Sequence, residues 1–324
     1  MKDVKRILVI TLSNIGDAVL TLPVVGSLMQ NFRYADVDVV VGIRAREVFE
    51  GDPRIKNMYV YDKAASLNQN LKFILNLRRN RYDLIVDLRN GFLGFFIGPR
   101  FWLKPTLKSP KGKIHKIDVH LYKIEKLGLK IDPNSYPIWI RQIDADNMSE
   151  LLRKRGILSS DSVVCISPGA KSHIKRWRED GFAEVCDRLI DEFKVKVLFV
   201  GDSDDCQICD RIINSMKNYA VSISGQTNLR ELAWCIKRSR LLITNDSAPL
   251  HIAGSIGTPS VAIFGPTDHK KYGPRDGLGI AAYKRLHCSP CEVALCKYNL
   301  ECMKAVEADE VFEAAEIILR GELK

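Results

Sequence analysis

The sequence predicts an α/β protein made of two doubly wound domains that face each other across a cleft. Short β-branched runs alternate with helix-like segments, which is typical of parallel sheets assembled from βαβ units. At 324 residues the chain is too long for one ordinary core. The predicted strands are almost continuously apolar, as expected for strands that are covered on both faces.

The predicted strands fall into two sets. The first set is 6–11, 37–42, 58–61 and 84–87, and the second is 163–167, 196–200, 220–222, 241–244 and 260–264. Helices are expected between strands, for example at 182–193 and 229–238, where apolar residues recur every three or four positions. The stretch 131–143 contains Asp132-Pro133-Asn134 and Pro137, which break regular structure, and a helix is expected at 145–155. We therefore expect domains at 1–158 and 159–306, with a helix at about 307–324 that packs back on the first domain.

Composition and charge narrow the class of protein. Hydrophobic residues make up 46% of the chain and charged residues 27%, the balance of a globular protein. The formal net charge of +10 favours anionic partners, namely nucleotides, phosphorylated glycans, nucleic acid or an anionic membrane surface. No apolar run is long enough to span a membrane, and the apolar start lacks a small-residue cleavage site, so we interpret it as a strand. Nine cysteines, an odd number without secretory context, indicate reduced thiols in a cytoplasm.

The loop after the first strand carries a carboxylate at a helix start. It reads Ser13-Asn14-Ile15-Gly16-Asp17 and leads into an apolar helix. Backbone N–H groups keep an Asp in a first turn ionised and able to accept a proton, but such an Asp also caps the helix by itself. On the residues alone, capping is the favoured interpretation. Neither G-x-G-x-x-G nor G-x-x-x-x-G-K-[ST] occurs, which weakens the dehydrogenase and P-loop alternatives.

Two loops of the second half suit an anionic ligand. The first places Lys171, Lys175 and Arg176 around Gly169 directly after a strand, a pattern that fits a diphosphate site and a solvated basic loop equally well. The second, 243–253, ends a strand in Asn-Asp-Ser and opens a helix that carries His251. Another strand-end turn, 264–268, follows and brings backbone near a ligand.

Taken in order, these segments resemble glycosyltransferase family 9, the ADP-heptose:lipopolysaccharide heptosyltransferases. The matching stretches are IGDAVLTLP at 15–23, SPGAKSHIKRW at 167–177, SGQTNLRELA at 224–233, NDSAPLHIAGSIGTPSVAIFGPTD at 245–268 and a cysteine-bearing tail. They preserve order and spacing over most of the chain. The resemblance implies two Rossmann-like domains in the GT-B arrangement, a nucleotide sugar bound mainly by the second domain, and no required metal or cofactor.

The resemblance also implies a role for each loop. Asp17 matches the general base, and Lys175 matches the lysine that contacts the diphosphate. The residues expected to contact the donor are Asp246, Ser247, Ala248, His251, Lys171, Thr227, Gly169 and Gly265, and those expected on the acceptor side are Asn14, Gly16, Lys111 and Lys113.

We therefore expect an inverting, metal-independent transferase that moves a heptose from ADP-heptose to a lipopolysaccharide inner-core acceptor. Its expected partners are the nucleotide sugar, a lipid-linked oligosaccharide and the inner face of the cytoplasmic membrane, but not nucleic acid. One alternative keeps the fold and changes the sugar or acceptor, and another is a nucleotide-sugar epimerase. A third is a non-catalytic protein that binds anionic glycans or nucleic acid.

Two motifs leave metal binding open. Asp202-Ser203-Asp204 matches the D-x-D motif of another glycosyltransferase class, whose sheet pattern differs from the one expected here. Four thiols, those of Cys288, Cys291, Cys296 and Cys302, are numerous enough to hold zinc or an iron–sulfur cluster. Their spacing differs from the paired C-x2-C knuckle, so a reduced structural cluster is favoured.

The segment 91–103, GFLGFFIGPRFWL, is apolar and aromatic, and lysines 104, 108, 111 and 113 follow it. It suits a helix buried against the first sheet, or a surface that rests on an anionic membrane or meets a lipid-linked acceptor. We expect its phenylalanines to be buried and the lysines to meet phosphates.

Overall fold

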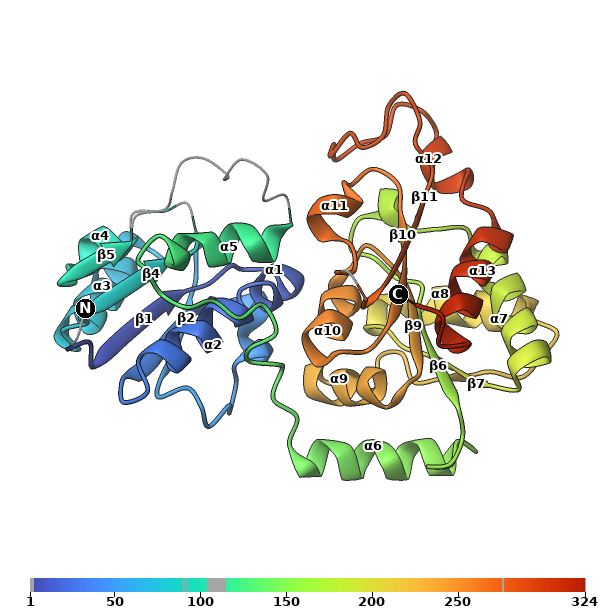
Figure 1. Ribbon diagram of the computed structural model, residues 1–324, viewed down its shortest axis with the longest axis horizontal. Coiled ribbons are helices and arrows are strands. Elements are labelled where there is room, and N and C mark those ends of the chain that lie inside the picture. Colours follow the sequence, from blue (N-terminus) through green and yellow to red (C-terminus); the bar gives the residue numbers. More distant parts are fainter. Residues whose placement is uncertain (1–2, 90, 92, 104–114, 276, 324) are drawn as a thin grey trace. The chain divides into compact units, whose positions relative to one another are not determined.

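The computed structural model describes residues 3–89, 91, 93–103, 115–275 and 277–323. The chain divides into two compact units, Met1–Trp139 (unit 1) and Ile140–Lys324 (unit 2), and each folds around one parallel sheet (Figure 1). The boundary lies before the expected residue 158, because the helix after it, α6 (Gln142–Lys154), belongs to unit 2. This helix packs against the helix 229–238 of unit 2, where Asp144 lies 3.2 Å from Arg230.

Unit 1 has five parallel strands in the order β3-β2-β1-β4-β5. These are β1 (Arg6–Ile10), β2 (Asp36–Gly42), β3 (Met58–Tyr61), β4 (Leu84–Asp87) and β5 (Phe101–Leu103). The helices are α1 (Ile15–Val19), α2 (Leu22–Asn31), η1 (Ile43–Val48), α3 (Leu67–Arg79), α4 (Leu93–Ile97) and α5 (Lys116–Glu125). The central strand β1 pairs its last residue, Ile10, with Val40 on one side and Asp87 on the other. The loops after β1 and β4 therefore leave the same edge of the sheet, at the point where the strand order reverses.

Unit 2 has six parallel strands in the order β11-β10-β9-β6-β7-β8. These are β6 (Val163–Ser167), β7 (Lys196–Phe199), β8 (Val221–Ser222), β9 (Leu241–Asn245), β10 (Ser260–Phe264) and β11 (Gly279–Tyr283). The helices are η2 (His173–Lys175), α7 (Glu179–Phe193), η3 (Ser203–Asp205), α8 (Cys206–Ser215), α9 (Leu229–Arg238), α10 (Ala248–Ile256), α11 (His269–Tyr272), α12 (Glu301–Lys304) and α13 (Ala308–Leu319). Here the order reverses between β6 and β9, whose ends meet at Ser167 and Thr244.

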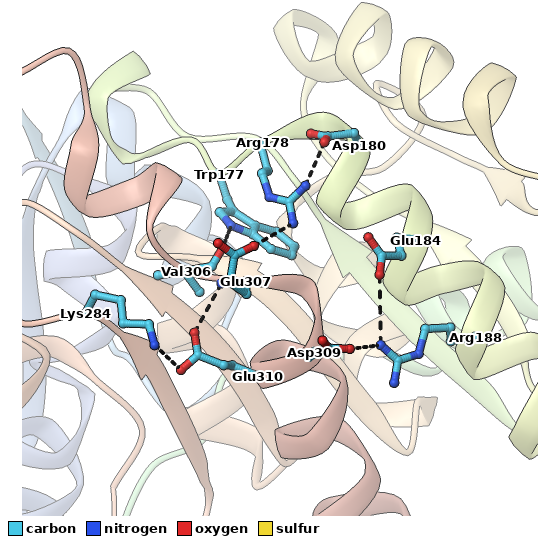
Figure 2. Close-up of polar contacts among 10 residues, drawn as sticks. All are labelled: Trp177, Arg178, Asp180, Glu184, Arg188, Lys284, Val306, Glu307, Asp309 and Glu310. Carbon is cyan, nitrogen blue, oxygen red and sulfur yellow. Dashed lines mark hydrogen bonds and ion pairs between the residues drawn. The ribbon is translucent and has the colours of Figure 1, made fainter.

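The last helix, α13, packs within unit 2, contrary to the expectation that it returns to the first domain. Its buried face, centred on Phe312, joins the core beneath α7 and β10. Figure 2 shows the polar contacts around it: Arg188 of α7 lies 2.6 Å from Asp309, and Trp177 Nε1 donates to the Val306 carbonyl at 2.9 Å. These contacts and the buried face explain why the helix stays with unit 2.

The aromatic segment 91–103 does not form one buried helix. It folds into the short helix α4 and the edge strand β5, and Phe95 and Phe96 are 59% and 54% exposed. The expectation that these phenylalanines are buried is therefore wrong, because the residues with which α4 contacts the core are Leu93, Gly94 and Ile97. No helix in the described part of the chain has the length and apolarity to span a membrane.

Candidate active site

The site in unit 2 lies at the carboxyl ends of β6 and β9, where the strand order reverses and where open α/β sheets bind their ligands. Lys175 follows β6 on the η2 turn, and Asp246 follows β9. Lys175 Nζ lies 2.7 Å from Asp246 Oδ2. The Asp246 side chain is 5% exposed and that of Lys175 is 30% exposed. The structure thus joins two of the predicted site residues, with the cation on the accessible side.

Two residues that the sequence did not single out hold this pair. Thr267 Oγ1 donates to Asp246 Oδ2 at 2.6 Å, so one carboxylate oxygen accepts from both Thr267 and Lys175. The buried Asn245 donates from Nδ2 to the Pro168 carbonyl at 2.6 Å and accepts the Trp177 backbone N–H at 3.1 Å. Asn245 therefore fixes both ends of the Lys175 loop to β9. The position of Asn245 at the end of a predicted strand, next to Asp246, was the feature of the sequence that could have identified it.

The start of α10 lies beside the Lys175–Asp246 pair. Ser247 is its N-cap residue, and the Ser247 hydroxyl lies 3.2 Å from Thr244 Oγ1. Ser247 and Ala248 are partly exposed, and so is His251 one turn along, whose ring centroid lies 6.4 Å from that of Tyr272. This mouth offers free backbone N–H groups and an imidazole to an anionic ligand.

Lys171 points to a different group from Lys175. Its ammonium lies 3.0 Å from Asp202 and 2.9 Å from Asp204, and the hydrogen bonds that it donates, first that to Asp204, raise the pKa of Lys171. Lys171 in turn lowers the pKa of Asp204. The D-x-D carboxylates are therefore paired with a lysine. Gly169 is required here, because a Cβ on it would stand 2.1 Å from the carboxyl group of Asp205.

Thr227 and Gly265 are the remaining predicted donor residues of unit 2. Thr227 is partly exposed and precedes Asn228, the N-cap of α9. The preceding residue, Gln226, lines a polar hollow together with Arg155, Cys206, Asp210, Ser222 and Ser224, among others. Gly265 is buried, and a Cβ on it would stand 2.4 Å from Met303 Sδ and 3.0 Å from Cys302 Sγ. Gly265 therefore makes room for the cysteine tail.

The four tail cysteines form a loose group around Cys302. Burial raises the pKa of Cys302, with a smaller contribution from its neighbours Cys288, Cys296 and Cys291. Cys296 Sγ accepts the backbone N–H groups of Tyr298 and Leu300, each at 3.3 Å. Across the residues that the structure describes, no set of three or more His, Cys, Asp or Glu side chains is placed to hold a metal. The metal alternative gains no support from the geometry.

In unit 1, Asp17 lies in the first turn of α1 and is partly exposed. Asn14 Nδ2 donates to Asp17 Oδ2 at 3.1 Å, and the Asn14 side chain makes no capping hydrogen bond to the helix. Gly16 lies between them. The loop passes close to β2, since a Cβ on Gly42 would stand 2.8 Å from Ser13 Cα. The predicted acceptor residues Lys111 and Lys113 lie outside the described residues.

A buried polar group that the sequence did not indicate lies at the same sheet edge. Asp87, at the end of β4, is fully buried, and burial raises its pKa to about 6. The Arg89 backbone N–H donates to its Oδ1 at 2.9 Å. Lys123 and His120 of α5 are also buried, and burial lowers the pKa of His120 to about 3. Each of these three residues is a single polar position among apolar neighbours, so the sequence pattern did not indicate that they are buried.

Comparison with known proteins decides the family. A family model described as glycosyltransferase family 9 (heptosyltransferase) matches residues 126–301, more than half of the chain. The chain belongs to glycosyltransferase family 9. It is therefore a glycosyltransferase of the heptosyltransferase family, as its motifs indicated.

Individual members of the family resemble the chain over most of its length. Lipopolysaccharide heptosyltransferase 3 of Escherichia coli strain K12 is 29% identical over 285 residues, which cover 80% of this chain and 82% of the relative. A family 9 glycosyl transferase structure from Veillonella parvula superposes with a TM-score of 0.86 at 24% identity, covering 98% of both chains. The structure of E. coli ADP-heptose lps heptosyltransferase II gives a TM-score of 0.78 at 19% identity, covering 98% of this chain and 99% of that one. The predicted GT-B fold class is confirmed.

Proposed function

We propose that the protein transfers a heptose from ADP-heptose to a lipopolysaccharide inner-core acceptor, with inversion and without a metal. The observation that carries the proposal is the Lys175–Asp246 pair, a cation held at the strand-order reversal beside the start of α10. The names of the relatives, which include a lipopolysaccharide heptosyltransferase and an ADP-heptose transferase, support the choice of donor and acceptor.

On the donor side, the bond between the anomeric carbon and the diphosphate oxygen breaks and leaves negative charge on ADP. The ammonium group of Lys175 stabilises that charge, and the N–H groups at Ser247 and Ala248 add hydrogen bonds without a second cation. Asp246 orients Lys175 through its ion pair, and His251 contacts the donor. Lys171 is held by two aspartates, so its contact with the donor is a smaller contribution.

On the acceptor side, Asp17 takes the proton from the attacking hydroxyl as the new glycosidic bond forms opposite the leaving group. Its partial exposure and its hydrogen bond from Asn14 support this role, because the carboxylate is oriented yet accessible. Gly16 leaves space for the sugar next to it.

Substitution of the base tests the mechanism. Asp17→Asn keeps the shape of the side chain and removes the basic oxygen, so kcat should fall by about 10²–10⁴ while donor affinity is retained. Transfer to a purified inner-core acceptor and calorimetric titration of ADP measure the two quantities. Asp36→Asn is a matched control, because Asp36 is exposed at the opposite, amino-terminal end of β2 and should leave both unchanged. An unchanged kcat for Asp17→Asn would refute the assignment.

A nucleotide-sugar panel tests the donor and separates the alternatives. ADP-heptose should raise the melting temperature more than UDP- or GDP-sugars, and transfer should persist in EDTA. Stabilisation by another nucleotide sugar alone would exclude ADP-heptose. An epimerase would convert its donor in the absence of any acceptor glycan.

A further inference from the structure

Unit 1 carries an exposed apolar surface that its own fold does not use. It consists of Leu67, Leu71 and Leu75 on α3 with Phe95 and Phe96 on α4, and we call it the α3–α4 surface. These side chains have exposed fractions between 48% and 88%. Isolated exposed apolar residues are common, but a contiguous set marks an interaction site.

The five side chains lie on two short helices that pack side by side. Leu67, Leu71 and Leu75 are four residues apart and form one stripe along α3. Arg78 continues the stripe three residues later, and its Nη2 lies 4.0 Å from the position of a Cβ on Gly98, just after α4. α3 packs beside α4 (Figure 1), and the rings of Phe95 and Phe96 are 5.6 Å apart. The stripe and the two rings therefore share one flank of unit 1.

The stripe is separate from the side of α3 that faces the core. Leu77 is fully buried, and Phe73 and Ile74 pack with it against Ile85 and Leu8. Helix α3 thus contacts the core of unit 1 through residues other than those of the stripe. Polar residues at Leu71 and Leu75 would satisfy the fold equally well, so the leucines there indicate an external apolar partner.

The charge around the surface selects the partner. Residues 62–103 contain seven Lys or Arg and three acidic residues, Asp62, Asp83 and Asp87, and the exposed Asp62 accepts the Ala64 backbone N–H. Asp87 is buried, and Asp83 accepts the backbone N–H groups of Lys5 and Arg6. The basic side chains at the rim of the surface are Lys63, Lys72, Arg78, Arg79 and Arg100, all exposed.

We propose that the α3–α4 surface docks on an anionic lipid bilayer. Its leucine and phenylalanine side chains enter the boundary between headgroups and acyl chains, and its basic rim binds the lipid phosphates. A two-fold contact with a second copy is disfavoured, because it would bring two basic rims together. The inference goes beyond the transfer reaction and holds whatever sugar is moved.

Vesicle binding by the full chain tests the proposal. The protein should co-sediment with vesicles of phosphatidylcholine and phosphatidylglycerol, bind pure phosphatidylcholine at least about tenfold more weakly, and be released by salt. The triple variant Leu71→Ser, Phe95→Ser, Phe96→Ser should lose at least about tenfold in partition coefficient. Leu158→Ser with Tyr219→Ser is the matched control, because these residues are exposed apolar side chains of unit 2. Circular dichroism and thermal unfolding verify that each variant is folded.

Each outcome bears on the proposal. Equal binding by the triple variant and the wild type would overturn it, as would equal binding to anionic and neutral vesicles. A wild-type dimer that the triple variant converts to a monomer, without vesicle binding, would assign the surface to a second copy and also overturn it. Because vesicle binding needs no donor, loss of the proposed transfer activity leaves this test intact.

Discussion

At the scale of single residues, Lys175 and Asp246 form the ion pair on which the proposed donor site of unit 2 rests. Their hydrogen bond is charge-assisted and nearly removed from water on the aspartate side. Removal of either partner leaves the other without its counter-charge in a poorly solvated position. A single substitution in this pair should therefore cost more stability than one in an exposed pair. The sequence supplied both residues as candidates, but their contact depends on the register of β6 and β9 and on the Asn245 amide. No pattern in one chain reports such a contact.

A double-mutant cycle on Lys175→Met and Asp246→Asn should give a coupling energy of about 1–3 kcal/mol. The free energy of unfolding, measured by urea denaturation of the wild type, the two single variants and the double variant, provides it. The exposed pair Lys154–Glu150, also at 2.7 Å, is the control and should give at most about 0.5 kcal/mol. Equal coupling energies for the two pairs would show that Asp246 does not hold Lys175 more firmly than a surface contact does.

Asp87 makes stability depend on pH. Its folded pKa of about 6 exceeds the unfolded value of about 3.9, so the folded state binds more protons between these values. The free energy of unfolding contributed by this group is therefore greatest at low pH and falls as the pH rises from about 4 to about 6. Between pH 4 and pH 7, the stability difference between Asp87→Asn and the wild type should change by about 2–3 kcal/mol in favour of the variant. His120 titrates in both proteins, so its effect cancels. Parallel denaturation curves across this range would contradict the assignment.

At the scale of elements, the interior strands and the edge strands β3 and β8 were predictable, whereas the edge strands β5 and β11 were not. The four strands of unit 2 that flank the reversal are mostly apolar and almost entirely buried, and 163–167 and 260–264 were predicted with their observed bounds. β5 and β11 were missed. β5 lies in an aromatic run whose length suggested a helix, and β11 reads Gly-Ile-Ala-Ala-Tyr, which has weak strand character. β11 forms because it pairs with β10, where a Cβ on Gly279 would stand 2.1 Å from the Ser260 carbonyl oxygen. Pairing of this kind is a tertiary effect.

Helix α13 is predicted to be an integral part of the unit 2 core. Phe312→Ala should lower the free energy of unfolding by about 3–5 kcal/mol, because it leaves a cavity beside Phe193 and removes the ring beneath Arg188. Arg320→Ala, which removes an exposed pair with Glu316 and a cation–π contact with the Phe193 ring, should cost at most about 1 kcal/mol. Urea denaturation measures both. Similar small losses would mean that α13 is an appended helix.

For the whole molecule, the proposed donor and acceptor roles fall on different units. Unit 2 holds the Lys175–Asp246 pair and the α10 start, and unit 1 holds Asp17 and the α3–α4 surface. The net charge of +10 predicted an anionic partner without indicating its identity. Part of this positive charge lies around the α3–α4 surface. That surface exists because the fold leaves certain leucines of α3 exposed, and helical periodicity alone did not distinguish these leucines from those of the core.

This division predicts where the donor stabilises the chain. A ligand that binds only the folded form of unit 2 at about 100 times its Kd adds about 2.7 kcal/mol to that unit's free energy of unfolding. With ADP present, amide hydrogen exchange should slow in β6, β9 and β10, whose ends carry the site, while β1 and β2 of unit 1 keep their rates. Lys175→Met should reduce the effect in unit 2 and leave unit 1 unaltered, which controls for non-specific nucleotide binding. Protection confined to β1 and β2 would place the donor in unit 1 and reverse the proposed roles of Asp17 and Lys175.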